Sequence, residues 1–318
     1  MYGSYRKPRE LTWIFGCLIY LCLMAEAFFG YLLPWGQMSY WGAQVIVNLF
    51  SAVPIIGEDL GIWIRGDYTI SDITLNRFFA FHVVAVPLVL VGLVAAHLMA
   101  LHETGSNNPD GIEIKKQPKD PATGLPLDGI NSHPYYTVKD IVGVVVFLAV
   151  FSIIMFFVPD MGGYFLEANN FIPADPLKTP EHIAPVWCFT PYYAMLRAVP
   201  SYLGSQFWGV IVMGVAVMIF FALPWLDRGA VRSIRYRGTS YKLWLALFVV
   251  SFLVLGYLGV VPVTIWGQFP EGWPLLGTAD RATVVARVLT FTYFLFFLLM
   301  PWYTARDRTK PVPERVTG

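Results

Sequence analysis

Two histidines, His82 and His97, lie fifteen residues apart within one long apolar stretch, residues 78–101. In an α-helix their rings would be about 22 Å apart along the axis and about 60° apart around it, so both would face broadly the same side. Such a stretch is long enough to cross a membrane, with one ring in each leaflet. Imidazole is costly in lipid and is a common ligand of haem iron. The spacing suggests two haem sites, and hydrogen bonding to neighbouring helices is the alternative.

Two glycines, Gly16 and Gly30, nearly repeat this spacing within the preceding apolar stretch. Fourteen residues return to within about 40° of the same helix face. A glycine leaves room for a flat ring to lie against the helix backbone. Close packing of helices explains isolated glycines, but the matched spacing favours two stacked haems.

Two further stretches, residues 30–54 and 180–200, are rich in Trp, Tyr, Pro and Met and carry few charges. Such a composition is typical of a pocket for an apolar ring compound. An aromatic belt at the membrane interface is the alternative. That belt explains single aromatic residues, but it does not explain two long motifs on one side of the membrane.

Polar, titratable residues are expected together at the opposite membrane surface: His102, Ser106, Lys139 and Asp140. Groups of this kind could hold a quinone ring and deliver protons to it. The alternative is a pair of solvated helix ends, with Asp140 near a helix start.

The composition is that of a polytopic membrane protein, because 56% of the residues are hydrophobic, 14% are charged and the mean hydropathy is +0.57. The net charge of +1 argues against nucleic acid as a partner. Three cysteines, Cys17, Cys22 and Cys188, show neither a disulfide framework nor a metal-binding spacing.

Six membrane spans are predicted, at residues 11–33, 78–101, 141–158, 207–226, 243–261 and 284–303. Two shorter segments, 40–53 and 184–199, are predicted as interfacial or loop helices. Most of the 22 lysines and arginines lie in the N-terminus, the second and fourth loops and the C-terminal tail. The positive-inside rule therefore places both termini in the cytoplasm and the first and third loops on the outer side.

Four runs carry a family resemblance: LLPWGQMSYWGAQVIVNLFSAVP, TLNRFFAFHVV, HLMALHETGSNNPDG and HPYYTVKDI. They resemble cytochrome b, the quinone-handling core of the cytochrome bc complex, and the resemblance covers essentially the whole chain. It implies the bacterial, respiratory form and an all-α bundle equivalent to the last six of eight membrane helices. Residues 1–138 would complete the haem-binding region, and residues 139–318 would form the C-terminal region with the outer quinol-site loop.

The resemblance also implies roles for individual residues. His82 would ligate the low-potential haem on the outer side, and His97 the high-potential haem on the inner side. Arg77 could pair with a haem propionate, or it could simply anchor the chain at the interface. The outer quinol site would include Tyr31, Gly42, Pro185, Val186, Trp187 and Tyr193, and the inner quinone site His102, Ser106, Lys139 and Asp140, with Gly16 and Gly30 beside the haems.

The resemblance further implies that ubiquinol is oxidised at the outer site. One electron would go to a Rieske Fe–S protein and the other through two b-type haems to quinone at the inner site, with proton translocation. The expected partners are that Rieske protein, a cytochrome c1-type subunit and a second copy of the complex, in the bacterial inner membrane. The alternatives are a transporter or a non-functional fragment. A transporter is disfavoured by the few titratable groups within the spans, Glu26, His82 and His97, and by the lack of an internal repeat.

Two departures from the family pattern stand out. The family has two earlier helices, the second of which carries the opposite axial histidine for each haem, so the chain alone is expected to bind haem weakly or not at all. The outer-site motif Pro-Glu-Trp-Tyr reads PVWC here, at residues 185–188. Because valine accepts no proton, Glu181 is the candidate acceptor beside Tyr193. The alternative is that Glu181 is an ordinary loop residue and that water or a ligand of the Fe–S protein takes the proton.

Overall fold

The computed structural model describes residues 1–163, 167–201, 205–269 and 280–317. Among the described residues, the regular secondary structure is helical, and the only β pairs are isolated bridges. Six helical segments are long and apolar enough to cross a membrane, which confirms the predicted number of spans. They are Glu10–Leu32 (α1), Asp72–Thr104 (α4, η1 and α5), Ser132–Phe157 (η3 and α6), Phe207–Leu226 (α8), Thr239–Val260 (α9) and Arg281–Leu298 (α10).

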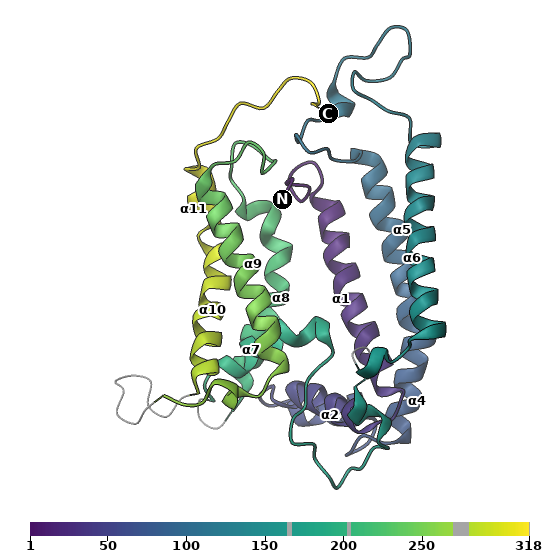
Figure 1. Ribbon diagram of the computed structural model, residues 1–318, viewed down its shortest axis with the longest axis vertical. Coiled ribbons are helices and arrows are strands. Elements are labelled where there is room, and N and C mark those ends of the chain that lie inside the picture. Colours follow the sequence, from purple (N-terminus) through teal and green to yellow (C-terminus); the bar gives the residue numbers. More distant parts are fainter. Residues whose placement is uncertain (164–166, 202–204, 270–279, 318) are drawn as a thin grey trace.

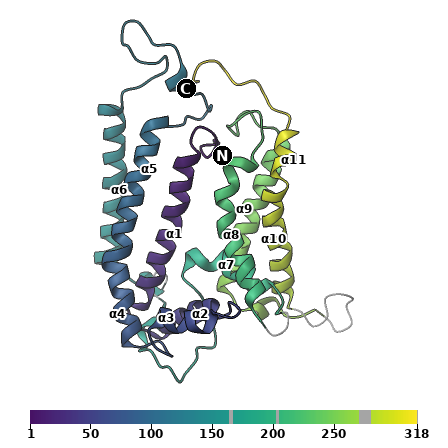
Figure 2. The ribbon, with the colours of Figure 1, turned by 180° about the vertical axis from the view of Figure 1, so that it is seen from behind.

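The long helices run roughly parallel in two groups, with α1, α5 and α6 in one and α8, α9 and α10 in the other (Figure 1). Helices α2 (Gln37–Ser51) and α3 (Gly57–Arg65) lie across one end of the molecule, and α7 (Thr190–Ala198) lies towards that end. The two termini lie at the opposite end (Figure 2). The first and third loops therefore share one side, as the charge pattern predicts.

The histidine-bearing span is one continuous helical segment of three parts, α4 (Asp72–Ala80), η1 (Phe81–Ala85) and α5 (Val86–Thr104). The middle part, η1, is a π-helical turn that contains His82. Pro87 lies one turn further along and has no N–H to donate to a preceding carbonyl, which favours a local widening of the helix. The π-turn therefore lies at the position of the first candidate ligand.

Helices form at both places where short helices are predicted, although their bounds differ. The second is shorter than the predicted segment 184–199, because α7 begins only at Thr190, with Pro191 in its first turn. The residues before it include Val186, whose ψ of 142° is extended. Helix α3 was not predicted. The last predicted span, 284–303, is divided at Leu299 into α10 and α11 (Met300–Ala305), where Pro301 lacks an N–H donor.

The core divides into two clusters. The larger joins α7 to α11 with part of α1 and contains fully buried Tyr293, Phe297 and Met300. The smaller holds α2 against the outer ends of α1 and α4 through residues such as Leu32 and Phe78. By contrast, α6 (Thr137–Phe157) has no buried residue, so its apolar side chains face outward, as suits a helix surrounded by lipid or by other apolar helices.

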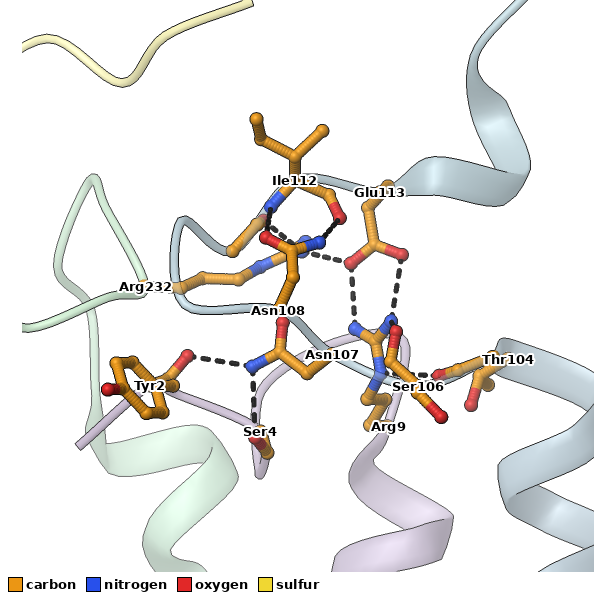
Figure 3. Close-up of polar contacts among 12 residues, drawn as sticks. Tyr2, Ser4, Arg9, Thr104, Ser106, Asn107, Asn108, Ile112, Glu113 and Arg232 are labelled. Carbon is orange, nitrogen blue, oxygen red and sulfur yellow. Dashed lines mark hydrogen bonds and ion pairs between the residues drawn. The ribbon is translucent and has the colours of Figure 1, made fainter. Parts of the chain in front are cut away.

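A polar network at the end of the molecule that holds the termini ties three segments together (Figure 3). Arg9 donates to both carboxylate oxygens of Glu113, at 2.8 and 3.3 Å, and to the carbonyl oxygen of Gly105 at 2.9 Å. Arg232, from the loop between α8 and α9, also bonds Glu113. Burial alone would raise the pKa of Glu113, but the bonds and charges of the two arginines hold that pKa below its usual value. The start of α1 is thereby fixed to the segment after α5.

Candidate functional site

Each candidate histidine lies opposite one of the candidate glycines. A Cβ atom at residue 16 would lie 3.6 Å from Cε1 of His97, and one at residue 30 would overlap the His82 ring. Both imidazoles therefore face α1, at two levels along the α1–α5 pair. Because glycine has no side chain, it is the residue that permits the approach of the ring at residue 30.

The His82 ring is held by Glu26 of α1. Its Nδ1 atom lies 2.9 Å from Oε1 of Glu26 and 3.1 Å from the carbonyl oxygen of the same residue. A carboxylate bound to one imidazole nitrogen fixes the orientation of the ring and makes the other nitrogen a better metal ligand. This arrangement directs Nε2 of His82 away from Glu26 as the candidate iron ligand.

The His97 ring opens onto a cavity of 780 Å³ between α1, α5 and the helices of the second group. This volume lies within the range of about 300–1,000 Å³ typical of ligand and cofactor sites. Its walls are apolar and aromatic, and they include Trp13, Tyr20 and Phe220 beside Gly16. Nδ1 of His97 is buried and has no hydrogen-bond partner among the described residues.

The donor set at these two positions fits haem iron. In the described parts of the chain, no three His, Cys, Asp or Glu side chains come together to hold a bare metal ion. Single imidazoles beside a glycine and an apolar cavity instead suit a metal that is already held by a flat macrocycle. Each position offers one imidazole of this chain that could ligate a haem iron.

A second cavity, of 190 Å³, lies between α2 and α7 on the side away from the termini. Three predicted outer-site residues line it: Gly42, Pro185 and Tyr193. Tyr31 lies behind this wall, with Cε1 3.4 Å from the position of a Cβ atom at Gly42. The surface of this cavity is almost wholly apolar, as suits an apolar ring compound.

The other predicted outer-site residues lie elsewhere. Val186 is not part of the wall of the smaller cavity, and Trp187 lines the larger cavity with 82% of its surface exposed. Glu181 is exposed, and it makes no hydrogen bond or ion pair within the described residues. Glu167, from the same loop, is the carboxylate that interacts electrostatically with the Tyr31 hydroxyl. Sequence reasoning missed Glu167, because nothing in the sequence relates residue 167 to residue 31.

Arg77 takes part in the corner between α3 and α4. Its guanidinium donates to the carbonyl oxygen of Trp63 at 2.7 Å and lies against Gly66, which has a positive φ of 78°. This contact accounts for Arg77 without a propionate, so a role beside the haem stays a prediction.

The four predicted inner-site residues lie exposed near the ends of α5 and α6. Lys115, which was not predicted, bonds the carbonyl oxygen of His102, and the carbonyl oxygen of Ser106 accepts from Arg9 at 3.4 Å. Lys139 and Asp140 lie in the first turn of α6, where a carboxylate is favoured by the helix dipole. Their joint role at a quinone site stays a prediction.

These features define a membrane-spanning helix bundle with two imidazole positions suited to haem and an apolar pocket near one end. Residues 1–191 match the family model described as "Cytochrome b(N-terminal)/b6/petB", and residues 173–269 match "Cytochrome b(C-terminal)/b6/petD". The chain belongs to the cytochrome b family.

Individual relatives agree with this assignment. The chain is 60% identical over 320 residues to a cytochrome b of Allochromatium vinosum, covering 100% of this chain and 73% of the relative. It is 45% identical over 316 residues to a cytochrome b of Rickettsia bellii, covering 99% of this chain and 71% of the relative. A solved structure described as a hyperthermophilic respiratory Complex III is 35% identical, with a TM-score of 0.78 over 95% of this chain and 72% of that chain.

Cytochrome b is a subunit of ubiquinol–cytochrome c reductase, an oxidoreductase of electron transport that contains haem. The family and the six candidate spans describe a multi-pass membrane protein of this kind. The assignment therefore favours the electron-transfer prediction over the transporter alternative.

Proposed function

We propose that this chain carries electrons across the membrane between a quinol oxidation site and a quinone reduction site. One b-type haem would be ligated by His82 and a second by His97. The observation that carries this proposal is the pairing of the two histidines with Gly30 and Gly16, at two levels of the α1–α5 pair.

The chain's own residues would position and insulate the two haems. The haems supply one-electron redox chemistry when bound. Glu26 would fix the ring orientation of His82, and the aromatic wall beside His97 would exclude water from the inner haem. The other three histidines lie in the last turn of α5, before α6 and in the third loop: His102, His133 and His182.

The outer site would be the 190 Å³ cavity, where Gly42, Pro185 and Tyr193 would enclose the ubiquinol ring. Quinone reduction at the other surface would use His102, Ser106, Lys139 and Asp140. Protons would leave on the outer side and enter on the inner side, with both termini cytoplasmic in a bacterial inner membrane. The partners would be a Rieske Fe–S protein, a cytochrome c1-type subunit and a second copy of the complex. The haem region would end near residue 138.

The test is a reduced-minus-oxidised visible spectrum of membranes that hold the assembled complex, together with quinol-dependent reduction of cytochrome c. His82→Leu and His97→Leu are each expected to abolish one of two haem signals. His133→Leu, an exposed histidine before α6, is the control and should retain both signals. Intact wild-type protein that shows no haem signal beside its partner subunits would contradict the proposal and support the alternative of a non-functional polypeptide.

A further inference from the structure

The two candidate haem ligands differ in what their Nδ1 atoms contact. Nδ1 of His82 lies 2.9 Å from Oε1 of Glu26 and 3.1 Å from the carbonyl oxygen of that residue. Nδ1 of His97 is buried and has no hydrogen-bond partner among the described residues. Both imidazoles face α1 beside a glycine, so the contact with a carboxylate distinguishes the His82 level from the His97 level.

The two levels also differ in the residue that α1 places one turn before each glycine. Glu26 lies four residues before Gly30, and Thr12 lies four residues before Gly16, so each lies near the helix face of its glycine. The Thr12 hydroxyl is buried and has no hydrogen-bond partner among the described residues. The described residues that line the cavity beside His97 include no Asp, Glu, Lys or Arg. Helix α1 therefore supplies a carboxylate at one level and a neutral group at the other.

The carboxylate of Glu26 lies within a membrane-spanning helix, where an ionisable side chain is costly and usually functional. Its one ion pair within the described parts of the chain is with the His82 ring. Its second oxygen, Oε2, is buried and has no hydrogen-bond partner in those parts. No described basic side chain of Lys or Arg pairs with this carboxylate, so its interaction is directed at His82.

A carboxylate in this position changes the electronic properties of an axial ligand. An imidazole that binds iron through Nε2 keeps its proton on Nδ1, and here Nδ1–H would donate to Glu26. Such a bond makes the ring a more basic ligand. A more basic ligand and a nearby negative charge both favour ferric over ferrous iron, and an apolar environment screens that charge less than water does. Both effects lower the reduction potential.

We propose that Glu26 lowers the reduction potential of the haem ligated by His82 relative to that of the haem ligated by His97. This inference rests on the haem ligation proposed above and assigns a cause to the difference between the two sites. Glu26 acts through His82 and is a positioning residue. No bond to Glu26 or His82 is made or broken, because a single electron arrives from the quinol and leaves towards the His97 level while the Nδ1 proton stays in place.

The location of Glu26 gives the lowered potential a direction. His82 lies beside Gly30, near the end of α1 that leads into α2 and the smaller cavity. His97 lies beside Gly16, nearer the end of the molecule that holds the termini. Because electrons pass spontaneously to the site of higher potential, a lower potential at the His82 level favours transfer from the outer side towards the inner side.

The experiment is a redox titration of both haem signals in the whole complex, with His82→Leu used to assign the signals. Glu26→Gln keeps the size of the side chain and an oxygen that can accept from Nδ1–H, but it removes the charge. At a fixed ambient potential the ratio of reduced to oxidised His82 haem should rise at least tenfold, which corresponds to about 59 mV for one electron. The His97 haem should be unchanged. Glu26→Asp retains a carboxylate and should give an intermediate potential.

Glu10→Gln is the matched control, since it makes the same substitution on the same helix, sixteen residues or about 24 Å away along the axis. It should leave the potential of the His82 haem unchanged. An unchanged potential in Glu26→Gln, or an equal shift of both haems, would overturn the inference. Loss of the His82 haem from Glu26→Gln would also overturn it, because the carboxylate would then be needed to assemble the site. Absence of both haem signals in the wild-type complex would instead overturn the proposed function.

Discussion

His97 on α5 lies against Gly16 on α1, with its Cε1 atom 3.6 Å from the position that a Cβ atom at residue 16 would take. At the other level, His82 approaches Gly30 so closely that the same atom would overlap its ring. The two levels are alike in their residues but differ in spacing. A single added methyl group should therefore affect them differently.

Gly30→Ala is expected to weaken or abolish the haem signal at His82, because the added Cβ must displace the imidazole. Gly16→Ala should retain its haem, since 3.6 Å is an ordinary contact distance. Gly92→Ala, where nothing lies within 4 Å, is the control. The reduced-minus-oxidised spectrum of each variant complex measures this, and an unchanged pair of haem signals in Gly30→Ala would contradict the expectation.

Gly42→Val should slow quinol oxidation by displacing the Tyr31 ring from its place against the cavity wall. The smaller Gly42→Ala should be tolerated, because its Cβ would lie 3.4 Å from Tyr31. The steady-state kcat for quinol oxidation reports the effect. Gly214→Val, in open space on α8, should behave as wild type. Equal kcat in the two valine variants would show that the position of Tyr31 does not matter.

Glu113→Gln should destabilise the protein, because it leaves the guanidinium of Arg9, which is 3% exposed, without its charged partner. Removing one member of such a pair costs about 3 kcal/mol. A lowered Tm in detergent would record this loss. Glu103→Gln removes an exposed carboxylate in the last turn of α5 and should leave the Tm unchanged. The same Tm for both variants would argue that the network of Figure 3 adds little to stability.

The C-terminal tail should detach at low pH. Asp110 accepts from the Tyr236 hydroxyl at 2.7 Å and from the backbone N–H of Thr317 at 2.9 Å, and these bonds lower its pKa to about 2. A lowered pKa in the folded state means that the stabilisation is complete above the usual pKa of 3.8 and is lost as the pH falls to about 2. Pepsin cleavage of the tail should rise across this range, and Asp110→Asn should expose the tail to trypsin at pH 7. Cleavage that does not change with pH would contradict this.

Much of the fold follows from local sequence. Apolar runs of bilayer length predict all six spans, because the length of a membrane helix follows from local sequence. The ends agree less well, and the third span begins at Ser132 where residue 141 was predicted. The predicted helix bounds were wrong near Pro191 and Pro301, because each proline lies in the first turn of a new helix. Helix α3 was missed because it is short and its stability depends on packing.

For the candidate site, the sequence by itself determined the spacing of His82 and His97 and of the two glycines, since helical periodicity converts residue number into direction. Only the tertiary structure decided which glycine meets which histidine. Ser39 and Asn170 are far apart in the chain, and the hydrogen bond between them depends on the folding of the third loop onto α2. Long-range pairings of this kind arise from packing between segments, and no local pattern in the sequence encodes them.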